Sequence, residues 1–291
     1  MNVVGFILLA IIFINVGIFF YTTGFFSHPG SFDLTPPIVS PPDYGGPSIS
    51  TGTPATAGSS VKNGNATVSV PAGFTRDQLS AYFGLVRFDR VEPGDNTGLE
   101  HIVLHALPKS GESINVTGWT LQANRAAQVI PQAISSLDLL HPTLEGDIRL
   151  SAGNILRIYS TRSAAGASFR LNRCTGYLQN HFSFVPSLPQ ECPAVNRSDI
   201  VTLTGSCQQY MLSLKTCQEP VIGRIPGGSD SLCSYYANTL NYLGCVDRYK
   251  STPNFYSQEW RVWTGSPFLD DLHDRLLLLD RSGKLVDIYI Y

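Results

Sequence analysis

From about Val68 to the C-terminal residue, short stretches that alternate apolar and polar positions are separated by turn-forming residues. Alternation with a period of two predicts β-strands that bury one face. The connecting stretches, such as "PGDNTG" and "PKSGES", supply the Gly, Pro, Asn and Asp that turns require. No helical pattern separates the first strands, which favours an antiparallel β-sandwich over a parallel α/β sheet. The predicted strands are 84–92, 99–107, 114–121, 147–150, 154–160, 168–172 and 259–265, followed by two terminal strands around a turn at 280–283.

One of these strands, "INVTGWTLQ" (114–122), is interrupted by a Gly-Trp pair. Glycine at position 118 lets the backbone turn. The next residue, Trp119, carries a side chain that buries on the order of 200 Å². Trp119 is a candidate either for a binding site or for the centre of a core between two sheets. We favour the second interpretation and predict that Trp119 is the plug of the sandwich core.

The pattern changes to a helical period between Cys174 and about residue 258, which predicts a helical insertion within the β domain. Two apolar stripes have helical spacing, and a Ser–Asp capping signal precedes the second. The first stripe comprises Cys207, Met211 and Leu214, and the second comprises Cys233, Tyr236 and Leu240.

The first 68 residues contain only three of the charged residues of the chain, and none of these lies in residues 1–26. A helix of roughly 20 apolar residues crosses a bilayer, so residues 1–26 predict one transmembrane anchor. A cleaved signal peptide is disfavoured because no basic n-region and no good cleavage site are present. A pilin-type N-terminus is disfavoured because Ala10 occupies the position of its usual Glu. Residues 27–68, rich in Pro, Gly, Ser and Thr, predict a disordered stalk.

Composition narrows the functional classes for residues 69–291. The formal net charge of the chain is −2, and no basic stripe of the kind that nucleic-acid binders carry is present. The sequence contains no P-loop, no G-x-S-x-G and no H-E-x-x-H motif. We therefore expect neither a nucleic-acid partner nor a cofactor.

Six cysteines fall within the predicted insertion, and none forms a closely spaced pair of the kind that structural zinc sites use. An even number behind a membrane anchor favours disulfides in an oxidising compartment, which places the C-terminal domain outside the cytoplasm. Fifteen connectivities are possible. We favour a nested set, Cys207–Cys245 and Cys217–Cys233, because two antiparallel helices would align these positions, with Cys174–Cys192 closing the preceding loop. A sequential set, Cys207–Cys217 and Cys233–Cys245, is the alternative.

Two further clusters are candidates for chemistry. His101 and His105 share one face of a strand, but no nearby acid or cysteine completes a metal site, so a polar outer face is the simpler interpretation. The segment "FLDDLHDR" groups Asp270, Asp271, His273 and Asp274, which suggests acid–base chemistry or calcium binding. We interpret it as a solvated turn before the terminal strands.

Several motifs resemble the lamin-tail domain, an immunoglobulin-like β-sandwich. They are "GLEHIVLHA", "INVTGWTLQANRAAQVIP", "DIRLSAGNILRIYS" and "DRLLLLDRSGKLVDIYIY", and the resemblance covers residues 83–172 and 259–291. The stretches "FRLNRCTGYL" and "YLGCVDRYKSTPNFYSQEWRVW" further resemble bacterial membrane-anchored lamin-tail proteins, in which a cysteine-bearing insertion splits the sandwich. The chain lacks the coiled-coil rod and the nuclear-localisation cluster of lamins, so nuclear filament assembly is not implied.

The sequence thus predicts a mainly β fold: an immunoglobulin-like (lamin-tail) β-sandwich at 69–291 with a disulfide-bearing α-helical insertion at about 174–258, preceded by one transmembrane helix. The resemblance implies a single-pass plasma-membrane protein whose extracytoplasmic domain binds or scaffolds an unknown protein or cell-envelope ligand, without catalysis. The alternative is an enzyme or metal-binding ectodomain that uses the insertion and the acidic cluster at 270–274.

Overall fold

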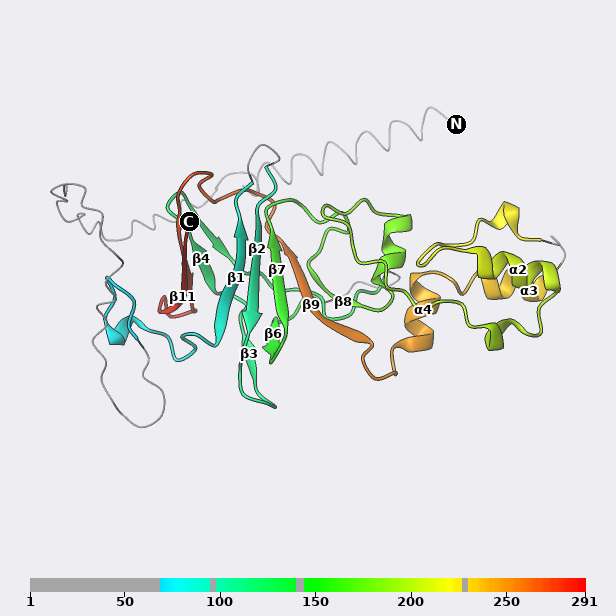
Figure 1. Cartoon of the computed structure of the whole chain (residues 1–291), viewed down its shortest axis with the longest axis horizontal. Helices are drawn as coiled ribbons and strands as arrows, with labels where there is room; N and C mark the ends of the chain where they lie inside the picture. Colours follow the sequence, from blue (N-terminus) through cyan, green and yellow to red (C-terminus); the bar gives the residue numbers. More distant parts are fainter. Residues whose placement is uncertain (1–68, 95–97, 140–143, 227–229) are drawn as a thin grey trace, which may run out of the picture. The chain divides into compact units, whose positions relative to one another are not determined.

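The computed structural model of the chain describes residues 69–94, 98–139, 144–226 and 230–291, which form a mainly β structure with three disulfides (Figure 1). The predicted anchor at 1–26 and the predicted stalk at 27–68 lie outside these residues. A short 3-10 helix, η1 (Arg76–Gln78), precedes the first strand.

The larger sheet has five strands in the order β1, β2, β7, β9, β8. Their bounds are β1 (Val86–Glu92), β2 (His101–Ala106), β7 (Ile155–Tyr159), β9 (Tyr256–Trp263) and β8 (Phe169–Asn172). All neighbours are antiparallel except β7 and β9, which are parallel. The sheet is therefore mainly antiparallel, as predicted, with one parallel pair that the sequence analysis did not predict. The chain reverses after β7 to form β8 at the sheet edge, reverses again, and places β9 between the two.

A second sheet has four antiparallel strands in the order β11, β10, β4, β5. The predicted turn at 280–283 joins its last two strands, and Gly283 has the expected positive φ of 73°. The Gly283 N–H donates to the Asp280 carbonyl, which closes the turn. The bounds are β11 (Leu285–Ile290), β10 (Arg275–Leu279), β4 (Thr120–Gln122) and β5 (Ala127–Val129).

The stretch predicted as one strand at 114–121 is two strands that belong to different sheets. β3 (Ser113–Asn115) pairs with β6 (Arg149–Ser151) in a small third sheet, whereas β4 joins the four-stranded sheet. The break lies at Gly118, whose φ of 78° is in the left-handed region, and the Trp119 N–H closes a turn onto the Val116 carbonyl. The Gly-Trp pair is therefore the point where the chain changes sheets.

The three sheets contribute to one hydrophobic core, which includes Trp119. The Trp119 side chain is 2% exposed, and its ring centroid lies 5.6 Å from that of Tyr82. Its burial agrees with the predicted role as core plug.

The edge strands of the two larger sheets, β1 and β11, meet along one side of this core. The Phe88 N–H of β1 donates to the Asp287 carboxylate of β11 at 2.7 Å, and the Gly84 N–H donates to the Val286 carbonyl at 3.0 Å. Burial raises the pKa of Asp287 above its usual range. These bonds satisfy backbone groups that an open edge strand would leave unpaired.

The predicted helical insertion is present and lies between β8 and β9. Its helices are short, and the Asp230 side chain caps α3 by accepting the Cys233 N–H at 3.0 Å. The second predicted stripe is only partly helical, because Cys233 and Tyr236 lie on α3 whereas Leu240 lies in the connection between α3 and α4. The bounds are η3 (Thr175–Asn180), η4 (Arg197–Ile200), α2 (Gly205–Ser213), η5 (Ile222–Arg224), α3 (Ser231–Ala237) and α4 (Tyr242–Tyr249).

All six cysteines form disulfides, as predicted, but the predicted pairings are wrong. The observed bonds are Cys174–Cys245, Cys192–Cys217 and Cys207–Cys233. Neither the nested nor the sequential set occurs, because the insertion has two cores.

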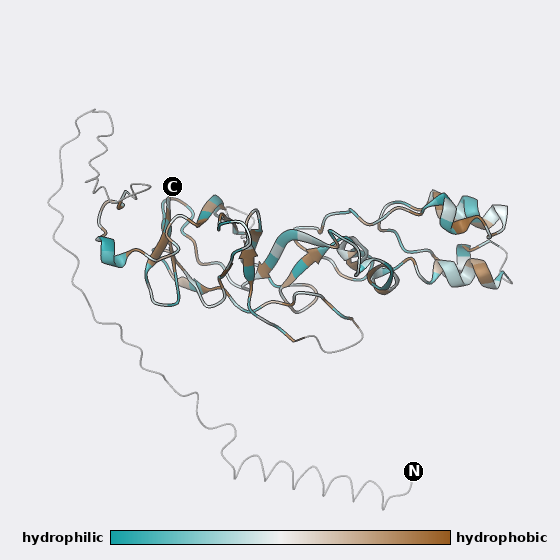
Figure 2. Cartoon of the chain, turned by 90° about the horizontal axis from the view of Figure 1, so that it is seen from below, coloured by the Kyte–Doolittle hydropathy of each residue, from teal (hydrophilic) through white to brown (hydrophobic). Residues whose placement is uncertain are grey.

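Cys207 on α2 and Cys233 on α3 belong to one of these cores, which also contains Ile200, Leu203 and Leu240 from the segments beside these helices. The two helices lie side by side (Figures 1 and 2). Cys245 on α4 belongs to the other core, which contains Cys174, Cys192 and Cys217 and extends onto the outer face of the five-stranded sheet. Each cysteine is therefore bonded within its own core.

Candidate functional site

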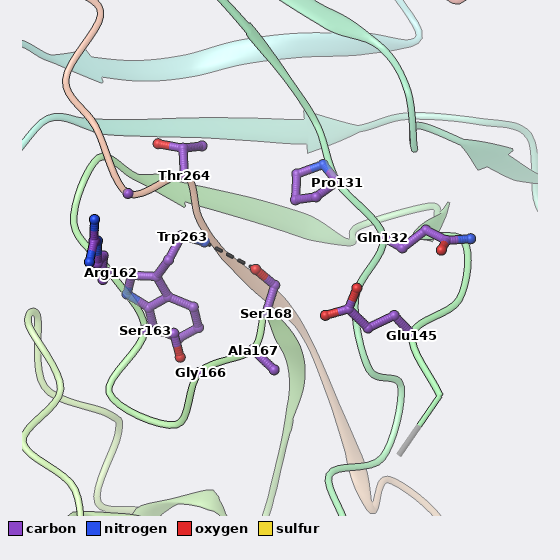
Figure 3. A pocket seen from close by; sticks show the side chains of 11 residues that line it. Pro131, Gln132, Glu145, Arg162, Ser163, Gly166, Ala167, Ser168, Trp263 and Thr264 are labelled. Atoms are coloured by element: carbon purple, nitrogen blue, oxygen red, sulfur yellow. Dashed lines mark hydrogen bonds between the residues drawn. The ribbon is translucent and has the colours of Figure 1, made fainter. Parts of the chain in front are cut away.

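A pocket of about 390 Å³ opens beside the end of β9 (Figure 3). It lies between Pro131, Gln132 and Glu145 on one side and residues of the β7–β8 loop on the other. Its walls combine charged, hydroxyl-bearing and apolar groups. The lining residues are Pro131, Gln132, Glu145, Arg162, Ser163, Gly166, Ala167, Ser168, Trp263, Thr264 and Gly265.

Trp263, the last residue of β9, supplies the aromatic part of the lining. Its indole packs against Tyr159, Phe169 and Phe184 with centroid distances of 6.0, 5.4 and 5.8 Å. The side chain remains 8% exposed at the pocket. Its backbone N–H donates to the Ser168 hydroxyl at 3.2 Å, which leaves the hydroxyl proton of Ser168 available to a ligand.

The loop between β7 and β8 carries Arg162 and Ser163. The Gly166 N–H donates to the Ser163 carbonyl, and Gly166 adopts a φ of 76° that completes this turn. The Ser163 hydroxyl oxygen is buried and has no hydrogen-bond partner among the described residues. Buried polar groups are nearly always paired, so this hydroxyl is unusual.

The opposite wall is formed by two short segments that bridge each other. Ala133 and Gly146 exchange backbone hydrogen bonds of 3.0 and 2.9 Å, and the residues that precede them, Gln132 and Glu145, both line the pocket. The Ile134 N–H donates to the Ser168 carbonyl at 2.8 Å and anchors this wall to the start of β8.

Opposite charges occupy the two sides of the pocket. Figure 3 shows Arg162 beside Trp263 and Ser163, with Glu145 and Pro131 across the opening. Both charged side chains are exposed, and neither forms an ion pair with another described residue. A ligand in this pocket would therefore meet a donor on one side and an acceptor on the other.

The predicted polar face of β2 is present, and His101 is partly covered on it. Its ring stacks on Tyr159 at 4.7 Å, and Nδ1 lies 2.9 Å from the Glu92 carboxylate. Burial lowers the pKa of His101 below its usual value, although Glu92 acts in the opposite direction. His105 lies on the same face but does not belong to this cluster.

The neighbouring strands continue this polar row with Arg157, Glu259 and Arg261. The Glu259 carboxylate accepts from Arg157 at 3.0 Å and from Arg261 at 2.7 Å. The buried Arg261 also donates to the carbonyls of Pro186 and Ser187 at 3.2 and 2.9 Å. These charges already have partners, so the row holds the insertion onto the sheet and is not a free site.

The acidic segment at 270–274 organises its own turn. The buried Asp274 accepts the backbone N–H groups of Asp270 at 2.9 Å and Asn124 at 2.8 Å. The Asp270 carboxylate accepts the N–H of Leu272 at 3.0 Å, and such backbone bonds lower the pKa of Asp270. Across the described ranges, no group of three His, Cys, Asp or Glu side chains is arranged to hold a metal ion.

Just before this segment, a buried carboxylate fixes the chain to the five-stranded sheet. Glu100 is 3% exposed and accepts the N–H groups of Phe268 at 2.9 Å and Leu269 at 2.8 Å. Burial, the larger effect, raises the pKa of Glu100, whereas these two hydrogen bonds lower it. This segment is therefore held more firmly than the solvated turn that the sequence predicts.

No protein-family model, no curated protein and no solved structure matches this chain.

No helix among the described residues has both the length and the apolar composition needed to cross a membrane.

Sequence reasoning missed the pocket and its four principal side chains, Glu145, Arg162, Ser163 and Trp263. One signal was present in the sequence. Trp263 shares its side of β9 with Glu259 and Arg261, whereas Trp260 and Val262 face the core. An aromatic residue at a polar position of an alternating strand indicates a second packing surface on the outer face.

Proposed function

We propose that this chain is a membrane-anchored extracytoplasmic module that binds or scaffolds a cell-envelope ligand and performs no catalysis. The observation that carries the proposal is the pairing of all six cysteines into three disulfides. Structural disulfides persist in oxidising compartments and are rare in the cytosol. The uncharged run at 1–26 supplies the anchor in this proposal, and residues 27–68 supply the spacer.

A binding role fits the open pocket, in which the exposed charged side chains of Glu145 and Arg162 lie beside an aromatic side chain. The alternative, an enzyme or metal site at 270–274, is weakened because Asp270 and Asp274 already accept backbone N–H groups. Metal analysis of the purified chain tests this alternative, and a stoichiometric metal ion would favour it.

The finer fold assignment belongs to the same proposal. We infer an immunoglobulin-like, lamin-tail type of sandwich, supported by the motif "DRLLLLDRSGKLVDIYIY", which forms the β10–β11 hairpin, and by the core position of Trp119. The parallel β7–β9 pair is a departure from an all-antiparallel sandwich.

Membrane fractionation tests the proposed anchor and topology. Carbonate-washed membranes should retain the full-length chain, whereas a chain that starts near Val68 should be soluble. In intact cells, protease added from outside should digest the C-terminal domain while a cytosolic marker survives. Recovery of the full-length chain in the wash, or protection of the domain until lysis, would contradict the proposal.

A further inference from the structure

The pocket beside Trp263 has hydrogen-bonding capacity that the described residues leave unused. Arg162 and Glu145 line it with exposed side chains, and neither forms an ion pair with another described residue. The guanidinium offers N–H donors, and the carboxylate offers two acceptor oxygens. These two side chains therefore point to a polar ligand.

The charges of the pocket restrict the ligand further. An anion that pairs with Arg162 would face the carboxylate of Glu145 across the opening, and a cation that pairs with Glu145 would face Arg162 (Figure 3). Hydroxyl groups both donate and accept hydrogen bonds, whereas guanidinium only donates and carboxylate only accepts. A neutral ligand with several hydroxyl groups satisfies both sides at once.

The size and the apolar lining are consistent with one ring of such a ligand. A volume of about 390 Å³ is near the lower end of small-molecule pockets. Pro131, Ala167 and the indole of Trp263 offer apolar surface between the polar groups. A sugar ring has C–H faces and hydroxyl edges, and it is therefore amphipathic in the same way as this lining.

We propose that the pocket formed by Glu145, Arg162, Ser163 and Trp263 binds one neutral pyranose residue of a saccharide. This inference rests on the proposed binding function and names the ligand class of that function. Arg162 donates to ring hydroxyls, Glu145 accepts from them, and the apolar lining contacts the C–H face of the ring.

The test is ligand-observed NMR on the purified full-length chain, kept in a detergent whose headgroup is not a sugar. The probes are methyl glucoside, methyl galactoside, methyl mannoside and N-acetylglucosamine at about 10 mM, tenfold above a Kd of about 1 mM. Alanine, a zwitterionic amino acid, is the competing probe. We expect saturation transfer to at least one saccharide and none to alanine.

Variants locate the binding. Glu145→Gln and Arg162→Gln should each weaken saccharide binding by about tenfold, the loss typical of a hydrogen bond to a charged group. The matched controls Glu112→Gln and Arg224→Gln, on exposed residues outside the pocket, should bind like the wild type.

Binding of alanine in place of saccharides, absence of any saccharide signal, or equal binding by the pocket variants would each overturn the inference. The assay uses purified protein, so its outcome is separate from that of the membrane fractionation. A chain that binds saccharides but is washed from membranes by carbonate contradicts the anchor alone.

Discussion

Cys174 and Cys245, which are 71 positions apart in the sequence, are joined by a disulfide with their Cα atoms 5.7 Å apart. Cys174 follows the end of β8, and Cys245 lies in α4 shortly before β9. The bond therefore fixes the start and the end of the insertion beside the five-stranded sheet. The Cys207–Cys233 bond, in contrast, joins α2 to α3 within the insertion.

Disulfide mapping gives the most direct check of this arrangement. Non-reduced proteolysis followed by mass spectrometry should yield linked peptides that contain Cys174 with Cys245, Cys192 with Cys217, and Cys207 with Cys233. No thiol should react with an alkylating agent before reduction. A Cys207–Cys245 peptide would contradict the two-core organisation of the insertion.

Removal of the Cys174–Cys245 bond should destabilise the protein more than removal of the Cys207–Cys233 bond. The double variant Cys174→Ala with Cys245→Ala opens the longer loop and should cost about 4 kcal/mol in urea unfolding. In hydrogen exchange it should loosen β8, β9 and the whole insertion. The matched pair Cys207→Ala with Cys233→Ala should loosen only α2 and α3, and an identical exchange pattern in both would disprove the distinction.

Gly176 is required by the Cys192–Cys217 disulfide. A Cβ atom at this position would overlap Cys217 Sγ and lie 2.8 Å from the Pro189 carbonyl oxygen. Gly176→Ala should therefore lower the free energy of unfolding by at least about 2 kcal/mol and leave Cys192 and Cys217 open to alkylation. Gly205→Ala is the control, because its Cβ would meet nothing within 4 Å, and it should change stability by about 1 kcal/mol or less.

Trp119→Ala should destabilise the protein by about 3–5 kcal/mol, because it removes a large buried side chain from the main core. Chemical unfolding monitored by circular dichroism measures this change. Val129→Ala, a truncation at a half-exposed site that pairs with Thr120 on the next strand, should have a small effect. An unchanged unfolding free energy for Trp119→Ala would contradict the core role.

Glu100 should make the stability of the protein depend on pH. Its folded-state pKa lies above the usual value of 4.5 because of burial, so the folded state binds this proton more tightly than the unfolded state. Its contribution is then largest at low pH and falls as pH rises from 4.5 through the folded-state pKa. The difference in unfolding free energy between the wild type and Glu100→Gln should decrease over that range and then level off. A difference that increases with pH would contradict the burial argument.

Much of the sheet structure could be predicted from local pattern, because alternation and turn chemistry act over a few residues. The strands at 154–160, 168–172 and 259–265 and the turn at Gly283 are close to the observed elements. The break at Gly118 was also readable. The apolar positions are 114 and 116 before it but 119 and 121 after it, and such a change of parity cannot occur in one regular strand.

The disulfide pairing and the pocket could not be predicted in this way, because both depend on contacts between distant segments. The nested pairing assumed that Cys233 and Cys245 lie on one helix that faces α2. The chain instead breaks after Ala237, and α4 packs in the core that contains Cys174. Likewise, Glu145 and Arg162 line the same pocket only because separate backbone bridges bring their segments together.

The antiparallel pairing of β8 with β9 places Asn172 opposite Tyr256, so the whole segment 173–255 begins and ends at one point of the sheet. In topological terms it is removable, because a tight hairpin turn could replace it without changing the order of any strand. Excision would nevertheless uncover Phe169 and Trp263, whose rings pack against Phe184 of the removed segment. A domain that gained this segment by insertion therefore had to acquire a matching apolar patch on the outer face of its sheet. A domain that lost the segment would expose this patch to solvent, where it would promote association with other molecules.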